Sequence, residues 1–242
     1  VNGKGGVLKT TLTANVGALL AVSGWKVLLV DMDPQGNLGL DLGYRHGTLD
    51  DDGSALAQSL MFGTRLAPLK DIRPNLDVVP GGAELDQAAA GLIAQSSKDG
   101  SKAKLALARS LAPIAAEYDI IFIDCPPGFS VLSENIFNAA DIVLMPVIPT
   151  TLSIRTYHMV KDYFKEKDLD SNKMMCFFTM TDLRKNMHNE IMEELYKDKR
   201  FFQNYVPYLS DVEKMGLHKA PIMEFANSSY AAKCYRELWT EI

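Results

Sequence analysis

The first residues of the chain combine glycines with two lysines and two threonines, residue types that bind phosphate groups. The run reads Gly3-Lys4-Gly5-Gly6-Val7-Leu8-Lys9-Thr10-Thr11 and leads into apolar residues at helical spacing. Backbone N–H groups of a glycine-rich loop can surround phosphate oxygens, and the N-terminus of the following helix adds a favourable dipole. In such a loop Lys9 would reach the β and γ phosphates, and the Thr10 hydroxyl would ligate Mg²⁺. The segment therefore predicts a site for a nucleoside triphosphate.

Leu8 departs from the usual form of such a loop, which has glycine directly before the second lysine. Taken alone, the segment could also be a surface turn, with Lys4 as a solvated loop lysine. However, Lys-Gly-Gly-x-x-Lys-Thr resembles the deviant Walker A loop of the ParA and MinD group, in which the position before the second lysine varies. The resemblance implies that residues 3–11 bind ATP. It also implies that Lys4 crosses a dimer interface to touch the phosphates of the partner's nucleotide.

Two aspartates follow an apolar run, in the sequence Val-Asp-Met-Asp-Pro-Gln-Gly-Asn over residues 30–37. Asp31 and Asp33 are two residues apart, so on an extended chain they point to the same side and could both face a metal–nucleotide centre. Pro34 and Gly36 alone would also fit a simple turn. The run matches the ParA signature Asp-x-Asp-Pro-Gln-Gly-Asn. That match implies that Asp33 orients the attacking water and that Asp31 lies in the second shell of Mg²⁺.

A third run, residues 120–128, places four apolar residues before Asp124 and then reads Cys-Pro-Pro-Gly. This is the pattern of a Walker B strand, whose aspartate holds Mg²⁺, usually through a water. Asp-x-Pro-Pro-Gly resembles the switch loop of the ParA family, which implies that Pro127 lies beside the nucleotide. Cys125 is interpreted as a small buried residue rather than a metal-cluster ligand.

Two weaker similarities follow. Residues 141–156 resemble the strand and loop that follow Walker B in the family. Residues 179–184 stand where relatives place a strand end beside the adenine, which implies nucleotide contacts from Met180 and Asp182. Asp182 and Arg184 could equally form a surface ion pair of little energetic value.

Short apolar runs alternate with helical patterns along the whole chain, which predicts an α/β fold with a doubly wound, mostly parallel sheet and helices on both faces. Strands are expected near residues 25–30, 76–79, 120–123, 142–147 and 173–178, and helices over 9–23, 102–116 and 228–242. Such uniformly apolar strands are expected to be buried on both faces. We interpret residues 1–242 as a single domain. Only Val1 and Asn2 precede the loop, so most of a first strand is expected to lie upstream.

The net charge of −5 lies entirely in residues 1–150, which hold 11 Lys and Arg against 16 Asp and Glu. A protein that binds nucleic acid over its whole surface is usually basic, so any DNA contact requires a local patch or one completed by dimerisation. Three distant cysteines indicate neither a disulfide framework nor a zinc site. A reduced cytoplasm is the expected location, and no apolar run is long enough to span a membrane.

The resemblance covers the whole chain and implies an ATPase of the ParA family, a branch of the ParA/MinD superfamily of P-loop NTPases. Its implied properties are ATP and Mg²⁺ as cofactors, dimerisation on ATP binding and nonspecific binding of nucleoid DNA. Hydrolysis would be slow and stimulated by a ParB-like or other cargo adaptor, and would move plasmid, chromosome or organelle cargo. The arginines that relatives use for DNA are absent from residues 205–221. The candidate replacements are Lys185, Lys197, Lys199, Arg200, Lys214 and Lys219, which could also form solvated helix faces.

Two other classes remain as alternatives. A MinD-like membrane switch needs a basic amphipathic helix at the C-terminus. Here Glu237 and Glu241 surround Leu238 and Trp239, which is more typical of a packed helix, so no membrane partner is expected. Metabolic relatives, such as ATP-dependent carboxylases or metal-cluster loaders, lack the Asp-Pro-Gln-Gly-Asn run or carry extra cysteines.

Overall fold

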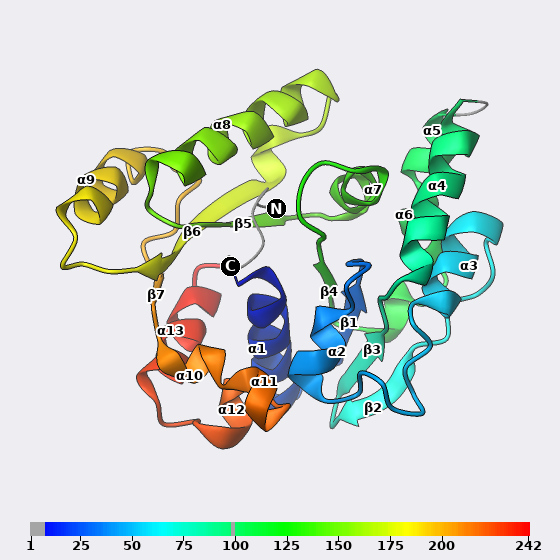
Figure 1. The fold of residues 1–242 in the computed structure, drawn as a ribbon, viewed down its shortest axis with the longest axis horizontal. Helices are drawn as coiled ribbons and strands as arrows, with labels where there is room; N and C mark the ends of the chain where they lie inside the picture. Colours follow the sequence, from blue (N-terminus) through cyan, green and yellow to red (C-terminus); the bar gives the residue numbers. More distant parts are fainter. Residues whose placement is uncertain (1–7, 98–99) are drawn as a thin grey trace.

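A computed structural model of the chain describes residues 8–97 and 100–242 as a layered α/β fold, with helices on both faces of a central sheet region (Figure 1). The strands are β1 (Val27–Asp31), β2 (Leu69–Arg73), β3 (Leu76–Val79), β4 (Ile120–Asp124), β5 (Val143–Val147), β6 (Met174–Thr181) and β7 (Val206–Pro207). The helices are α1 (Lys9–Val22), α2 (Asn37–Leu42), α3 (Ser54–Phe62), α4 (Glu84–Ser96), α5 (Gly100–Lys104), α6 (Ala106–Leu111), α7 (Val131–Ala139), α8 (Thr151–Glu166), α9 (Asn186–Leu195), α10 (Ser210–Glu213), α11 (Met215–His218), α12 (Ile222–Phe225) and α13 (Tyr230–Trp239).

The strands form two hydrogen-bonded groups, in the orders β2-β3-β1-β4 and β5-β6-β7. Every neighbouring pair is parallel except β2–β3, which is antiparallel at one edge. The predicted doubly wound, mostly parallel sheet is therefore confirmed. The sequence did not predict β2 and β7, because β2 has few apolar residues and β7 has only two residues.

The parallel register of β1 and β4 brings two of the predicted site residues together. Asp31 is paired with Asp124 at the carboxyl ends of these strands. Ligands of open α/β sheets bind at this edge. The loops that follow β1 and β4 therefore start side by side at this edge of the sheet.

Apolar side chains fill two separate cores, one on each face of the sheet. From β1, Leu28 and Val30 join the core beneath α3, α4, α6, α7, α8 and α9. Val27 and Leu29 point the other way, into the core shared with α1, α2 and α13. A strand buried on both faces needs apolar residues at every position, which is why this segment is continuously apolar.

Two expectations about local structure are wrong. The helix expected over 102–116 is divided into α5, α6 and a short 3₁₀ turn (Ala115–Glu117), and Pro113 stands where α6 has ended. The apolar residues of β4 are only half buried, although those of β1 are fully buried. The cause is a hollow of about 560 Å³ between β4 and β5, lined by Ile121, Ile123 and Leu144 among others. Among the described residues, no helix is long and apolar enough to cross a membrane.

Candidate nucleotide site at the carboxyl edge of the sheet

The N-terminus of α1 is open to an anion. Side chains of Ser130, Thr150 and Ser229 cap α7, α8 and α13, whereas within the described part of the chain α1 has no side-chain cap. Its first N–H groups therefore remain available to phosphate oxygens. The predicted residues Gly3, Lys4, Gly5, Gly6 and Val7 lie outside the described residues.

Leu8 adopts a left-handed backbone conformation directly before α1, with φ 64° and ψ 29°. Glycine enters this region without cost, whereas a residue with a Cβ is disfavoured there by about 1–2 kcal/mol. This explains why glycine usually occupies this position in phosphate-binding loops. Here Leu8 keeps the same backbone shape and packs its side chain against the core beneath α1.

Thr10 and Asp124 connect the start of α1 with the end of β4. The Thr10 hydroxyl donates a hydrogen bond of 2.6 Å to Asp124 Oδ2. The other carboxylate oxygen, Asp124 Oδ1, is buried and has no hydrogen-bond partner among the described residues. Mg²⁺ in nucleotide sites is held by one or two protein oxygens, phosphates and waters. A threonine hydroxyl beside a buried carboxylate with an unused oxygen fits that ion.

Three carboxylates lie close together at this edge of the sheet, and the pKa values of Asp31 and Asp124 are raised there. Burial raises the pKa of Asp124 to about 7; the Thr10 hydrogen bond lowers it and the charge of Asp33 raises it. Burial, followed by the charge of Asp124, raises the pKa of Asp31 well above its usual value. A bound divalent cation would offset this repulsion and favour the ionised forms.

Asp31 uses both of its oxygens to hold the loop that follows β1. Oδ1 accepts a hydrogen bond from the Asp33 N–H at 2.9 Å, and Oδ2 accepts one from the Leu38 N–H at 3.2 Å, in the first turn of α2. These bonds leave Asp31 as a support for the loop, and its predicted place in the second shell of Mg²⁺ stays a prediction.

Asp33 is 6% exposed at the same edge, and its Oδ1 accepts a hydrogen bond from the Gln35 N–H at 3.0 Å. The loop after β3 packs against it: a Cβ on Gly81 would lie 2.8 Å from the Asp33 carbonyl oxygen and 2.5 Å from that of Asp31. Arg45 stabilises this contact, because its guanidinium donates hydrogen bonds to the Gly81 carbonyl at 3.3 Å and to Asp52 at 3.0 Å. Sequence reasoning missed Gly81 and Arg45, although a Pro-Gly-Gly run after a strand was a signal.

The end of β6 contains the residues predicted to contact the adenine. Met180 has a left-handed backbone with φ 52°, at an irregularity in the pairing with β7. Asp182 binds the Arg184 guanidinium through two hydrogen bonds, of 2.8 and 2.9 Å. Arg184 lowers the pKa of Asp182 to about 2. The ion-pair interpretation is therefore correct, and contact of Met180 and Asp182 with nucleotide stays a prediction.

Two residues of the predicted switch loop follow β4. Cys125 is buried, and burial raises the pKa of its thiol to about 11, which keeps it protonated and agrees with a packing role. Pro127 is exposed in the turn that leads to α7. Its contact with nucleotide is also untested.

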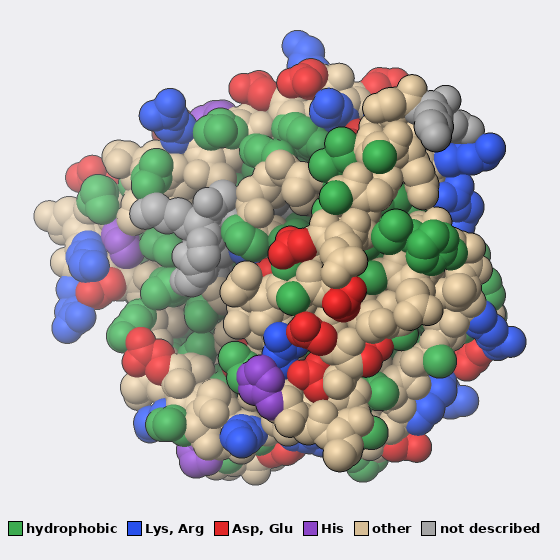
Figure 2. Space-filling model, turned by 45° about the vertical axis from the view of Figure 1, so that its right-hand side comes forward, with side chains coloured by type: hydrophobic (Ala, Val, Ile, Leu, Met, Phe, Trp, Pro, Cys, Tyr) green, Lys and Arg blue, Asp and Glu red, His purple; other side chains and the backbone are tan. Residues whose placement is uncertain are grey.

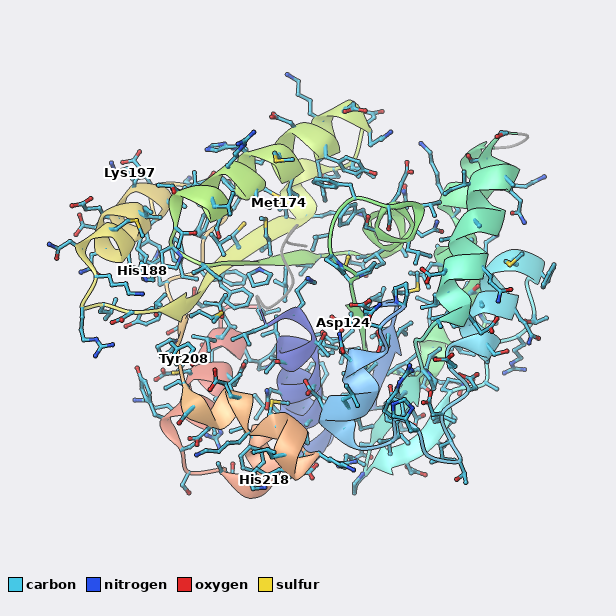
Figure 3. The ribbon with its side chains drawn as sticks, viewed as in Figure 1. Asp124, Met174, His188, Lys197, Tyr208 and His218 are labelled. Atoms are coloured by element: carbon cyan, nitrogen blue, oxygen red, sulfur yellow. The ribbon has the colours of Figure 1, made fainter. Side chains whose placement is uncertain are left out.

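The six basic residues proposed for DNA do not form one patch. Lys197, Lys199 and Arg200 line a groove of about 750 Å³ with Lys161, between α8 and the segment after α9. Lys214 belongs to the segment of α10 and α11, and Figure 3 shows Lys197 and His218 at opposite ends of the molecule. Acidic neighbours also pair with some of the cations: Arg200 with Asp198 at 3.0 Å, Lys197 with Glu194, and Lys214 with Asp211.

Comparisons with known proteins show which family the chain belongs to. A family model described as an AAA domain matches residues 1–176. The chain is similar to the chromosome-partitioning ATPase Soj of Treponema pallidum, with 31% identity over all of this chain and 94% of that one. It is 32% identical to the chromosome partitioning protein ParA of Myxococcus xanthus, over all of this chain and 85% of that one.

A comparison with solved structures shows that the fold is similar as well. A putative plasmid partition protein of Borrelia burgdorferi bound to AMPPNP superposes with a TM-score of 0.81, covering 99% of this chain and 94% of the other at 20% identity. The sequence relatives and the fold thus point to the same family. The chain belongs to the ParA and Soj family of partition ATPases.

Proposed function

We propose that this chain is an ATP-dependent switch that positions DNA or other cargo, with Mg²⁺ and ATP as cofactors. The observation that carries the proposal is the Thr10–Asp124 contact, because it joins the start of the phosphate-binding helix to an acidic strand end in one polar centre. Residues 3–11 bind the phosphates, with Thr10 as an Mg²⁺ ligand and Asp124 holding the ion through a water. Lys9 stabilises charge on the β and γ phosphates.

Hydrolysis in this proposal rests on positioning and electrostatics rather than covalent catalysis. Asp33 orients the attacking water, since its buried carboxylate lies at the same strand edge as Asp124. Turnover is slow, and a ParB-like or other cargo adaptor stimulates it. The direct test is phosphate release from Mg²⁺-ATP by the purified chain and by its Lys9→Ala variant. The variant should neither bind ATP nor hydrolyse it, and unchanged affinity would refute the phosphate site.

ATP binding is proposed to close a homodimer in which Lys4 contacts the partner's nucleotide. Light scattering with ATP, with ADP and without nucleotide tests this. The wild-type chain should dimerise with ATP, and Lys4→Ala should weaken the dimer while leaving binding to the monomer intact. A wild-type chain that stays monomeric with ATP under all conditions would refute the dimer.

The ATP dimer is proposed to bind duplex DNA, and this binding would account for its association with the nucleoid. Figure 2 shows Lys and Arg side chains spread around the outline of one face with Asp and Glu side chains among them, and further acidic side chains near its middle. A single protomer therefore attracts phosphates weakly, and two protomers double the number of cations. Affinity should fall with salt at a log–log slope of about −0.9 per neutralised phosphate.

The two separated basic groups make the DNA test specific. Lys199→Ala changes the groove between α8 and α9, and Lys214→Ala changes the α10–α11 segment. Each substitution should flatten the salt slope if its group contacts DNA, whereas Lys104→Ala, whose lysine pairs with Glu134 on α7, should not. A confirmed dimer that binds no DNA at low salt would contradict this part of the proposal.

A further inference from the structure

His188 is a buried histidine that connects α9 to the loop after β6. It is 3% exposed, and its Nδ1 accepts a hydrogen bond of 3.1 Å from the Asp182 N–H. Figure 3 shows His188 between α9 and the end of β6. A ring nitrogen that accepts from an N–H carries no proton, so His188 is neutral here, with its proton on Nε2.

The loop held by His188 has a defined shape. The Asn189 amide donates to the Leu183 carbonyl at 3.0 Å, and the Tyr208 N–H donates to the Thr181 carbonyl at 3.1 Å. These contacts fix residues 181–183 between α9 and β7. The His188 bond differs from the other two because it satisfies a backbone donor with a titratable side chain.

The proposed phosphate site indicates which part of the nucleotide this loop would meet. Lys9 and Thr10 mark where phosphates are proposed to bind. The carboxylates of Asp33 and Asp124 lie in the loop after β1 and at the end of β4, and Figure 1 shows both strands on one side of α1. The γ-phosphate must face that side, because the attacking water and the metal belong there. The rest of the nucleotide then extends to the other side, over the carboxyl ends of β5 and β6, where ligands of parallel sheets bind.

We propose that His188 is a positioning residue of the nucleotide site, which holds the loop after β6 in the shape that receives the base of the nucleotide. This inference rests on the proposed ATP site and adds a residue to it. Losing the acceptor would leave the Asp182 N–H without its buried partner and free the loop to move. The affinity for the base would fall, whereas the affinity for the phosphates at α1 would not change.

Protonation of His188 would have the same effect as removing it. Burial and the charge of Lys185 lower its pKa, and the charge of Asp182 raises it. Among the described residues, these are the charged groups that shift the pKa of the ring, and the net shift is downward. The hydrogen bond is therefore present at neutral pH and is lost as pH falls through the lowered pKa, because the imidazolium has no acceptor nitrogen.

Two variants and two ligands test the role of His188. His188→Asn can place an oxygen near Nδ1 and does not titrate, and His188→Leu fills space without an acceptor. Calorimetry should measure binding of ATP and of inorganic tripolyphosphate, which has no base. We expect His188→Leu to bind ATP about tenfold more weakly and tripolyphosphate as the wild type does. His188→Asn should bind both within about threefold of the wild type.

The ratio of ATP affinity to tripolyphosphate affinity should fall for the wild type as pH is lowered from 8 to 5.5. It should fall less for His188→Asn. Equal ATP binding by His188→Leu and the wild type, or equal loss of both ligands, would overturn the inference. If His188→Leu does not fold, a wild-type pH dependence in His188→Asn would overturn it. A wild-type chain that binds neither ligand would refute the proposed ATP site itself.

Discussion

Thr10 donates a hydrogen bond of 2.6 Å to Asp124, although the two residues are 114 positions apart in the chain. Thr10 lies in the first turn of α1, and Asp124 ends β4. The contact is possible because β4 pairs in parallel with β1 and α1 packs beside both strands. It places a hydroxyl and a carboxylate where Mg²⁺ would be bound together with phosphate oxygens.

Removing the Thr10 hydroxyl should uncouple ATP binding from Mg²⁺. Thr10→Val keeps the volume and loses the metal ligand, whereas Thr10→Ser keeps the hydroxyl. Mg²⁺ should strengthen ATP binding by the wild type and by Thr10→Ser to the same extent. For Thr10→Val, the increase in ATP affinity caused by Mg²⁺ should be about tenfold smaller. Calorimetry with Mg²⁺ and with a chelator measures this, and equal enhancement in all three proteins would contradict the assignment.

Asp33→Ala should leave ATP bound and nearly stop its hydrolysis. Loss of a group that positions the attacking water lowers the rate by about 10²–10⁴-fold. Steady-state phosphate release and ATP titration separate the two effects. Asp86→Ala, on the exposed face of α4, is the matched control and should hydrolyse ATP as the wild type does. An Asp33→Ala protein with wild-type turnover would show that Asp33 has another role.

The left-handed backbone at Leu8 predicts that glycine is tolerated better than alanine at this position. Leu8→Ala and Leu8→Gly both lose the side chain that packs beneath α1, but only glycine enters this conformation freely. Leu8→Gly should therefore have a free energy of unfolding higher than that of Leu8→Ala by about 1 kcal/mol. Urea unfolding measures both. If alanine is the more stable substitution, the left-handed conformation at this position is wrong.

Gly81→Ala should disturb the loop that carries Asp33. The added Cβ would lie 2.5 Å from the Asp31 carbonyl oxygen, so the loops after β1 and β3 must separate. Such overpacking costs about 1–3 kcal/mol, and turnover should fall with it. Gly216→Ala is the control, because a Cβ there would meet no atom of the described residues within 4 Å. Equal stability and turnover for the two variants would contradict the close contact.

The sequence alone determined the family and most of the fold. Residues 9–23 closely predict α1, and the apolar runs before Asp31 and Asp124 predict β1 and β4. For β1 the reason is burial on both faces, which requires continuous apolar residues. The three motifs could be recognised because phosphate and Mg²⁺ binding restrict residue type and local spacing. These constraints act within a few residues and are therefore visible in a linear sequence.

Only the tertiary structure decided which distant groups meet. It turned both Asp31 oxygens toward the loop backbone, brought Gly81 against that loop, and gave His188 the Asp182 N–H as its partner. It also divided the predicted basic patch, because α9 and α11 lie in different parts of the molecule (Figure 1). Such contacts depend on strand order and helix packing, and neither leaves a local pattern. A glycine or histidine shows its role only when the neighbouring elements are in place.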